Sequence, residues 1–228
     1  MHKKIRLNAA ATAGLLIILF FLIIAVFAPV IAPYDPKEMI ASYLPPSKEH
    51  ILGTNDVGQD IFSEMVYGTR VSLYIGIFAA FIVTGVGTVL ALVSGYFGGV
   101  ADKIITAITN IAMAVPSLPL TVLLIAYLNP GKWSLIIAIS ITAWTGTARI
   151  LRARVMQLKE LPFIKIEKTM GVHPAVILFK HILPNIKDII LTRGAMAISG
   201  AMMTEAGLSF LGLGEFGEKS WGSVLHYA

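Results

Sequence analysis

Few residues of this chain have the types and spacing that catalysis requires. The nearest match to a phosphate-binding loop runs from Gly212 to Ser220, but Glu218 separates Gly217 from Lys219 and breaks the G-x-x-x-x-G-K-[S/T] pattern. The 228 residues include no cysteine and five scattered histidines, which excludes cysteine nucleophiles and thiolate metal sites. We therefore expect no catalytic residue, no metal site and no cofactor bound by this chain.

Two charged residues interrupt an otherwise apolar stretch near the C-terminus. Arg193 and Glu205 are about 18 Å apart along a straight helix, so they cannot pair directly. Ionisable residues inside a membrane segment commonly mark function. We interpret Arg193 as an interfacial anchor near the cytoplasmic end. Glu205, with Met202 beside it, either belongs to a pathway or partner-subunit surface or makes a structural hydrogen bond, and Met202 is expected to pack rather than to bind a metal.

The segment from Arg149 to Lys187 carries eight Lys or Arg residues against two acids. It could lie on anionic headgroups or be a plain solvated loop. However, it also contains apolar residues at near-helical spacing, and Gly171 and Pro174 are suited to a turn and to the first turn of a new helix. Pro184 then restricts the chain. The pattern predicts two short helices that meet at an elbow, and exposed apolar residues there imply a partner protein.

The segment from Asp35 to Arg70 is rich in turn formers. Pro36, Pro45, Pro46 and several glycines punctuate it, which is typical of a solvated loop. Within residues 51–63, however, apolar residues alternate with turn formers, which suggests an ordered structure. Both interpretations stay open, and residues 61–67 could form an interfacial helix.

The elements that position these residues are membrane helices. The chain is 56% hydrophobic and 14% charged, with a mean hydropathy of +0.79, so much of it must be solvated by lipid. A span needs about 20 apolar residues. The sequence predicts an all-α polytopic protein with an uncleaved first helix and five spans, at Leu7–Tyr34, Val71–Ala101, Ile104–Gly131, Trp133–Ala148 and Ile189–Leu213.

The basic residues orient these spans. With the N-terminus in the cytoplasm, 12 of the 18 Lys and Arg residues lie inside, as the positive-inside rule requires. We therefore interpret the net charge of +5 as favouring contact with anionic membrane lipid rather than with nucleic acid. We divide the chain into residues 1–70, the first helix and an external loop, and residues 71–228, a core that contains a cytoplasmic coupling region at 149–187.

Three motifs resemble one known family. Gly171, followed after ten residues by Ile182–Asn185, resembles the cytoplasmic signature of binding-protein-dependent ABC importer permeases. More narrowly, Phe179–Asn185, Leu52–Asp60 and Glu205–Gly214 are similar to the second (C-type) permease of dipeptide, oligopeptide and nickel importers. The resemblance covers most of the chain.

The resemblance implies a permease subunit that forms half of a pathway for peptides or for nickel or metal chelates. Its partners would be a homologous permease, two cytoplasmic ATPase subunits that bind the ATP, and an extracytoplasmic solute-binding protein, in a prokaryotic plasma membrane. The residues expected to couple to the ATPase are Lys165, Glu167, Gly171, His173, Pro174, His181, Ile182, Leu183 and Pro184. The external signature comprises Gly53, Thr54, Asp56, Gly58 and Asp60.

The sequence departs from the family pattern at three places. Lys165 stands where the signature usually begins with glutamate, and Glu167, about 200° further round a helix, cannot replace it on the same face. Gln59 stands where the family usually has arginine. These permeases generally have a sixth helix, which the chain lacks, so Glu205 is expected to face hydrocarbon.

Two other interpretations remain. The chain could be a truncated or non-transporting membrane protein that keeps the permease fold. An ion-coupled secondary transporter is disfavoured, because the first four spans lack ionisable Asp, Glu, Lys or Arg residues for a relay.

Overall fold

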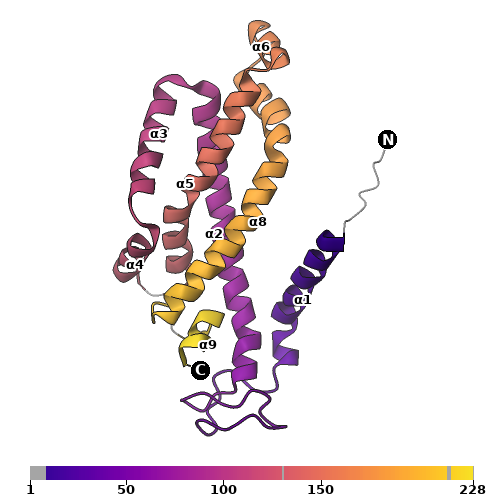
Figure 1. The fold of residues 1–228 in the computed structure, drawn as a ribbon, viewed down its shortest axis with the longest axis vertical. Helices are drawn as coiled ribbons and strands as arrows, with labels where there is room; N and C mark the ends of the chain where they lie inside the picture. The colour runs from indigo at the N-terminus through magenta and orange to yellow at the C-terminus, as the bar shows by residue number, and fades with distance from the viewer. Residues whose placement is uncertain (1–8, 130, 215–216, 228) are drawn as a thin grey trace. The chain divides into compact units, whose positions relative to one another are not determined.

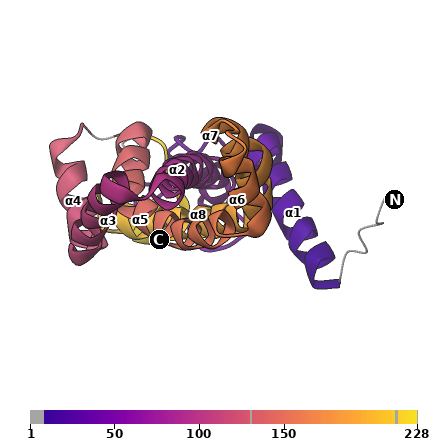
Figure 2. The same ribbon diagram turned by 90° about the horizontal axis from the view of Figure 1, so that it is seen from above.

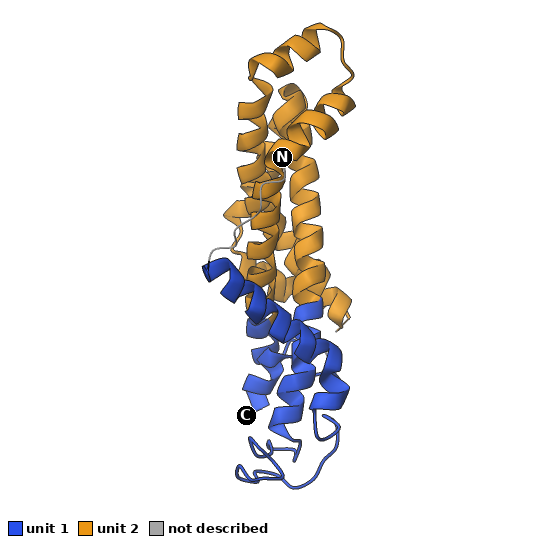
Figure 3. Cartoon of the chain, turned by 90° about the vertical axis from the view of Figure 1, so that its right-hand side faces the viewer, with its two compact units in different colours: residues 1–74, 206–228 blue, residues 75–205 orange. Residues whose placement is uncertain are grey.

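The structure is a computed structural model that describes residues 9–129, 131–214 and 217–227. The start of the first predicted span, residues 7 and 8, lies outside these residues. The described chain is helical, with one isolated β-bridge between Thr54 and Asp60, which confirms the all-α class (Figure 1). It divides into two compact units, residues 1–74 with 206–228, and residues 75–205 (Figure 3).

The first two helices correspond to the first two predicted spans. Helix α1, Ala9–Ile31, consists largely of apolar residues. Helix α2, Ile61–Phe97, has 37 residues and is about 55 Å long, well beyond the hydrocarbon thickness of a bilayer. The interfacial helix expected at residues 61–67 is wrong as a separate element, because these residues are the first turns of α2.

The third predicted span, Ile104–Gly131, is not one straight helix. It comprises α3, Gly99–Ala114, and α4, Ser117–Tyr127, which are bent by 90° at the break. The cause is Pro116, whose ring disfavours helical geometry in the preceding residue. Val115 is accordingly extended, with φ −84° and ψ 128°. Both helices pack against α5, Lys132–Lys159, which contains the fourth predicted span (Figure 2).

Three helices of the described residues, α1, α2 and α5, are long and apolar enough to cross a membrane. The bent pair α3 and α4 would make a fourth span if counted as one. Helix α8, Leu183–Phe210, contains most of the fifth predicted span and has 28 residues, but its composition falls short of the same standard. The fifth crossing therefore stays a prediction.

The predicted elbow is present, with one arm longer than expected. Helix α6, Pro162–Thr169, is the first arm, and Gly171 makes the turn with φ +77°, a conformation that favours glycine. The second arm begins with α7, Pro174–Val176, and passes through the π-helical turn η1, Ile177–Ile182, directly into α8.

Pro184 therefore does not end the second arm, contrary to the expectation of a short helix. In η1 the Leu183 amide donates to the Leu178 carbonyl, five residues back, so the backbone is wider there than in an α-helix. Proline has no amide to donate, and its ring would clash with the carbonyl four residues earlier in a regular helix. A locally widened turn is a common way to accommodate such a residue without ending the helix.

A buried aliphatic cluster holds the elbow to the helices below it. Its members come from α2, α5, α6, η1 and α8, all within residues 75–205: Ala91, Leu151, Val155, Leu158, Ile164, Ile177, Ile182 and Ile186. Ile177, Ile182 and Ile186 are completely buried. Because each arm contributes side chains to one closely packed cluster, the arms are fixed relative to α2 and α5.

We predict that Ile182→Ala lowers the free energy of unfolding by about 2 to 5 kcal/mol, because it removes a completely buried side chain and leaves a cavity. Thermal unfolding in detergent measures the loss. Phe179→Ala, three residues earlier on a side chain that is 67% exposed, is the matched control and should change the midpoint little. Equal midpoints for the two variants would contradict the packing described.

Candidate functional site

The elbow presents an apolar surface. Its large exposed apolar side chains, which we call the elbow face, are Leu161, Phe163, Ile166, Met170, Val176 and Phe179. Met170 is 76% exposed and Phe179 is 67% exposed. The exposed residues Lys165, Lys168 and Lys180 lie among them in the sequence. Exposed apolar side chains with charged residues near them in the sequence are typical of a protein-binding segment.

A polar contact joins the two arms of the elbow. Nε2 of His181, in η1, lies 2.9 Å from Oε1 of Glu167, in α6, and the Phe163 ring packs edge-on against the His181 ring. Two residues that were predicted to contact a partner therefore contact each other. Their side chains are each 25% exposed, so the pair remains within reach of a partner.

Lys165 has a local partner as well. Its ammonium lies 2.8 Å from the Glu160 carboxylate, and both side chains are about 60% exposed, at 60% and 62%. This hydrogen bond, together with the positive charge, lowers the pKa of the Glu160 carboxyl below its ordinary value. An exposed pair of this kind contributes little stability, so Lys165 can exchange Glu160 for an acid of another protein.

The other predicted coupling residues have mainly structural surroundings. His173 caps α7, since its Nδ1 accepts a hydrogen bond of 3.3 Å from the Ala175 amide, and Pro174 is the first residue of that helix. Ile182 is completely buried, so it offers no contact surface and could couple to an ATPase only through the side chains packed around it. Leu183 packs against the buried cluster, whereas Gly171 and Pro184 are exposed.

The loop before α2 is ordered, and its predicted signature is mostly buried. Asp60 caps α2 by accepting 2.8 Å hydrogen bonds from the Ser63 amide and hydroxyl, and its other oxygen lies 3.0 Å from Nδ1 of His50. The Thr54 hydroxyl donates to the Ala41 carbonyl and accepts from the Leu44 amide. These contacts tie three parts of the loop together.

The signature residues Gly53, Thr54, Gly58 and Asp60 are buried, and Asp56 alone among the five is exposed. Gly58 has φ +84° and lies against the backbone of residues 40 and 41, where a side chain would be strained. The signature therefore shapes the loop rather than offering a contact surface, with the exception of Asp56.

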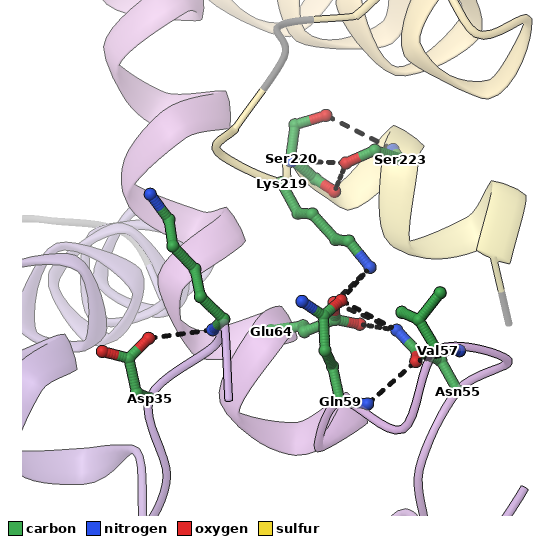
Figure 4. Close-up of polar contacts among 9 residues, drawn as sticks. Asp35, Asn55, Val57, Gln59, Glu64, Lys219, Ser220 and Ser223 are labelled. Carbon is green, nitrogen blue, oxygen red and sulfur yellow. Dashed lines mark hydrogen bonds and ion pairs between the residues drawn. The ribbon is translucent and has the colours of Figure 1, made fainter. Parts of the chain in front are cut away.

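A buried charge pair joins this loop to the C-terminal segment within the first unit (Figure 4). The Lys219 ammonium pairs with the Glu64 carboxylate and donates a 2.6 Å hydrogen bond to Oε1 of Gln59. The Asn55 amide donates to both Glu64 oxygens at 3.1 Å. Glu64 is 1% exposed, so its charge depends on these donors.

Lys219 is held in place by helix α9, Trp221–Tyr227. Ser220 is the residue before α9, and its amide donates 2.7 Å to the Ser223 hydroxyl, which fixes the start of that helix. The Trp221 ring then packs on the first turns of α2, where its Nε1 donates to the Met65 carbonyl at 3.2 Å. Sequence reasoning missed the pair of Glu64 and Lys219, because nothing in their spacing relates residues so far apart.

The predicted pathway residues differ in their surroundings. Glu205 is completely buried, so the expectation that it faces hydrocarbon is wrong, and its burial favours a structural role over contact with a partner subunit. Met202 packs directly on Gly76 of α2, since a Cβ added at Gly76 would lie only 2.5 Å from Cγ of Met202. Met202 is therefore a packing residue. Arg193, expected to be an interfacial anchor, instead lines a cavity within residues 75–205.

Comparison with known proteins places the chain among transporters. The family described as "Binding-protein-dependent transport system inner membrane component" matches residues 87–227, and the "N-terminal TM domain of oligopeptide transport permease C" matches residues 1–46. The oligopeptide transport system permease protein OppC of Bacillus subtilis is 39% identical over 224 residues, which are 97% of this chain and 73% of that protein.

Two further matches agree. The dipeptide transport system permease protein DppC of Bacillus subtilis is 35% identical over 96% of this chain and 70% of that protein. A structure of the MetNI methionine ABC transporter in an inward-facing conformation matches 72% of this chain and 88% of that chain, with a TM-score of 0.58. Its sequence identity is 19%, so this likeness concerns the fold alone.

We predict that Lys219→Met destabilises the first unit, because it leaves the buried Glu64 carboxylate without its cation. Glu64→Gln in the same chain should restore part of the loss, with a coupling energy of about 0.5 to 3 kcal/mol from the double-mutant cycle. Thermal unfolding of the four proteins in detergent provides the values. Additive effects would show that the two side chains do not interact.

Proposed function

Because the chain belongs to the family of binding-protein-dependent transport system inner membrane components, we propose that it forms half of a peptide-conducting pathway across a prokaryotic plasma membrane. It is a multi-pass permease subunit of an ABC importer, a family that works with ATPases and a binding protein. Peptides are the proposed substrate because the relatives named for oligopeptide and dipeptide transport match nearly its whole length.

The proposed complex contains this chain, a homologous permease, two ATPase subunits and a solute-binding protein. ATP is bound and hydrolysed by the ATPases in this proposal, and not by the permease itself. The N-terminus and the elbow lie in the cytoplasm, and the loop of residues 35–60 lies on the opposite side, as the distribution of basic residues favours.

The exposed elbow face is the observation that carries the proposal. The helices that carry these apolar side chains are held rigidly, because buried residues of α6 and η1 pack into the cluster with α2 and α5. A partner that moves the elbow would therefore move these helices with it, because closely packed interiors transmit displacement. An ATPase that changes shape during its cycle suits this arrangement.

We predict that Phe179→Ser weakens binding of the ATPase at least about tenfold, because large buried side chains dominate interface energetics. Co-purification of the ATPase with the membrane-inserted permease, and ATP-dependent uptake, measure the effect. Leu191→Ser is the control, since Leu191 is 70% exposed on α8 but lies outside the elbow. Unchanged ATPase binding by the Phe179 variant would refute the assignment of the elbow face.

The substrate is tested in proteoliposomes that contain the complete complex with its binding protein. We expect ATP-dependent accumulation of a labelled tripeptide, and none when ATP is replaced by a non-hydrolysable analogue. Uptake of nickel chloride is measured in parallel. Accumulation of nickel without peptide would overturn the peptide assignment, and an assembled complex that accumulates neither would indicate a non-transporting protein.

A further inference from the structure

A cavity of about 320 Å³ lies within residues 75–205, between α2, α4, α5 and α8. Its lining includes Val83, Thr121, Thr142, Thr147, Arg193 and Thr204. Other lining residues are small or apolar, such as Ala143, Ala197 and Gly200. The volume is near the lower limit for small-molecule sites, which suits one or two residues of a peptide rather than a whole oligopeptide.

Arg193 is the one formally charged residue among those that line the cavity, all of which the structure describes. Its Nε is buried and has no hydrogen-bond partner within the described residues. Nη1 lies 3.9 Å from the Met196 sulfur, a weak acceptor, and across the described ranges the guanidinium forms no ion pair. A cation in a membrane helix is costly unless an anion or acceptor approaches it.

The hydroxyl groups of the cavity complement this charge. Thr147 is completely buried, and its Oγ1 has no partner within the described part of the chain, so it can donate into the cavity. In contrast, the hydroxyls of Thr121 and Thr204 donate to carbonyls of their own helices, at 2.7 and 2.9 Å. The Thr204 oxygen then remains as an acceptor, which suits a peptide N–H group, whereas the Thr121 oxygen also lies 3.2 Å from the Thr142 hydroxyl.

We propose that this cavity binds the C-terminal carboxylate of the transported peptide, with Arg193 as the cationic donor and Thr147 as a second donor. The inference rests on the proposed function, because it concerns one end of the same substrate. A guanidinium matches a carboxylate with two parallel N–H donors, and the small apolar lining accepts different side chains without selecting among them. The carboxylate is common to all unmodified peptides, so its recognition does not restrict sequence.

The test uses the complete complex in proteoliposomes and two labelled tripeptides, one with a free C-terminal carboxylate and one with a C-terminal amide. Both are supplied at concentrations that saturate the binding protein, so that its own preference does not enter the comparison. We expect uptake of the free acid to exceed that of the amide at least about tenfold, as for other hydrogen bonds between charged groups.

Arg193→Gln should reduce uptake of the free acid to the rate of the amide, whereas Arg193→Lys should keep an intermediate ratio because it retains the charge without the planar fork. Lys187→Gln is the matched control. It removes a positive charge from an exposed position of α8 outside the cavity lining, and should leave the ratio unchanged. Co-purification with the partner subunits verifies that each variant assembles.

Three results would overturn the inference. Equal uptake of both peptides by the unmodified complex would show that the carboxylate is not recognised during passage. An Arg193→Gln variant that retains the ratio would place recognition elsewhere, and one that loses both activities equally while Arg193→Lys restores both would indicate a lipid-phosphate contact or another structural role. In each case ATP-dependent uptake by the unmodified complex would leave the proposed function standing, whereas its absence would refute the function itself.

Discussion

The packing of aliphatic side chains where the elbow meets α2, α5 and α8 is the interaction on which the arrangement of residues 75–205 depends. Leu151, Val155, Ile177 and Ile182 are buried in this cluster, so the elbow is part of the folded core and not a flexible connector. Outside this cluster, Glu167 of α6 and His181 of η1 form a polar contact that joins the two arms. Burial of apolar side chains stabilises the elbow, and the polar contact orients the two arms.

The charged residues differ in how fully they are partnered. In the unit that contains residues 1–74 and 206–228, the buried Glu64 is surrounded by the Lys219 ammonium and the Asn55 amide, and Asp60 by donors from its own helix and His50. Such fully partnered groups fix a fold. In the unit of residues 75–205, Asp102 and Arg152 likewise form a bidentate pair at 2.6 and 2.7 Å, whereas Arg193 has weak contacts in the described chain and faces a cavity. The partnered charges therefore serve structure, and the cavity charge is available to a ligand.

Sequence reasoning predicted what depends on composition and local chemistry. The helical class, the family, the apolar segments and the turn at Gly171 follow from hydropathy, motif spacing and the conformational freedom of glycine, and the structure and the comparisons confirm them. The break at Pro116 could also have been read from the sequence, because the residue before proline avoids helical geometry. It was missed because the hydropathy of residues 104–131 continues across it.

The remaining errors have tertiary causes. Pro184 is tolerated within a long helix because η1 widens the backbone there, which depends on packing rather than on the residues alone. The burial of Glu205 and the pairing of Glu64 with Lys219 likewise depend on which helices meet, information that residue spacing does not contain. The order of residues 51–63 was suggested by their alternating pattern, but a motif does not tell which of its residues face solvent and which are buried.

The continuity of η1 with α8 relates the elbow to the cavity in a physical sense. Arg193 lies about 17 Å along α8 from the end of η1, with no break in the helix between them. Helix α8 also carries Ala197 and Thr204 of the cavity lining. The opposite wall comes from α4, which is joined to α3 by the bend at Pro116 and packs on α5 rather than on the elbow. Because a regular helix moves nearly as a rigid rod, displacement of the elbow is carried along α8 to Arg193. Helices α2 and α5, which also line the cavity, pack into the elbow cluster as well, so displacement of the elbow acts on three of the four helices around the cavity.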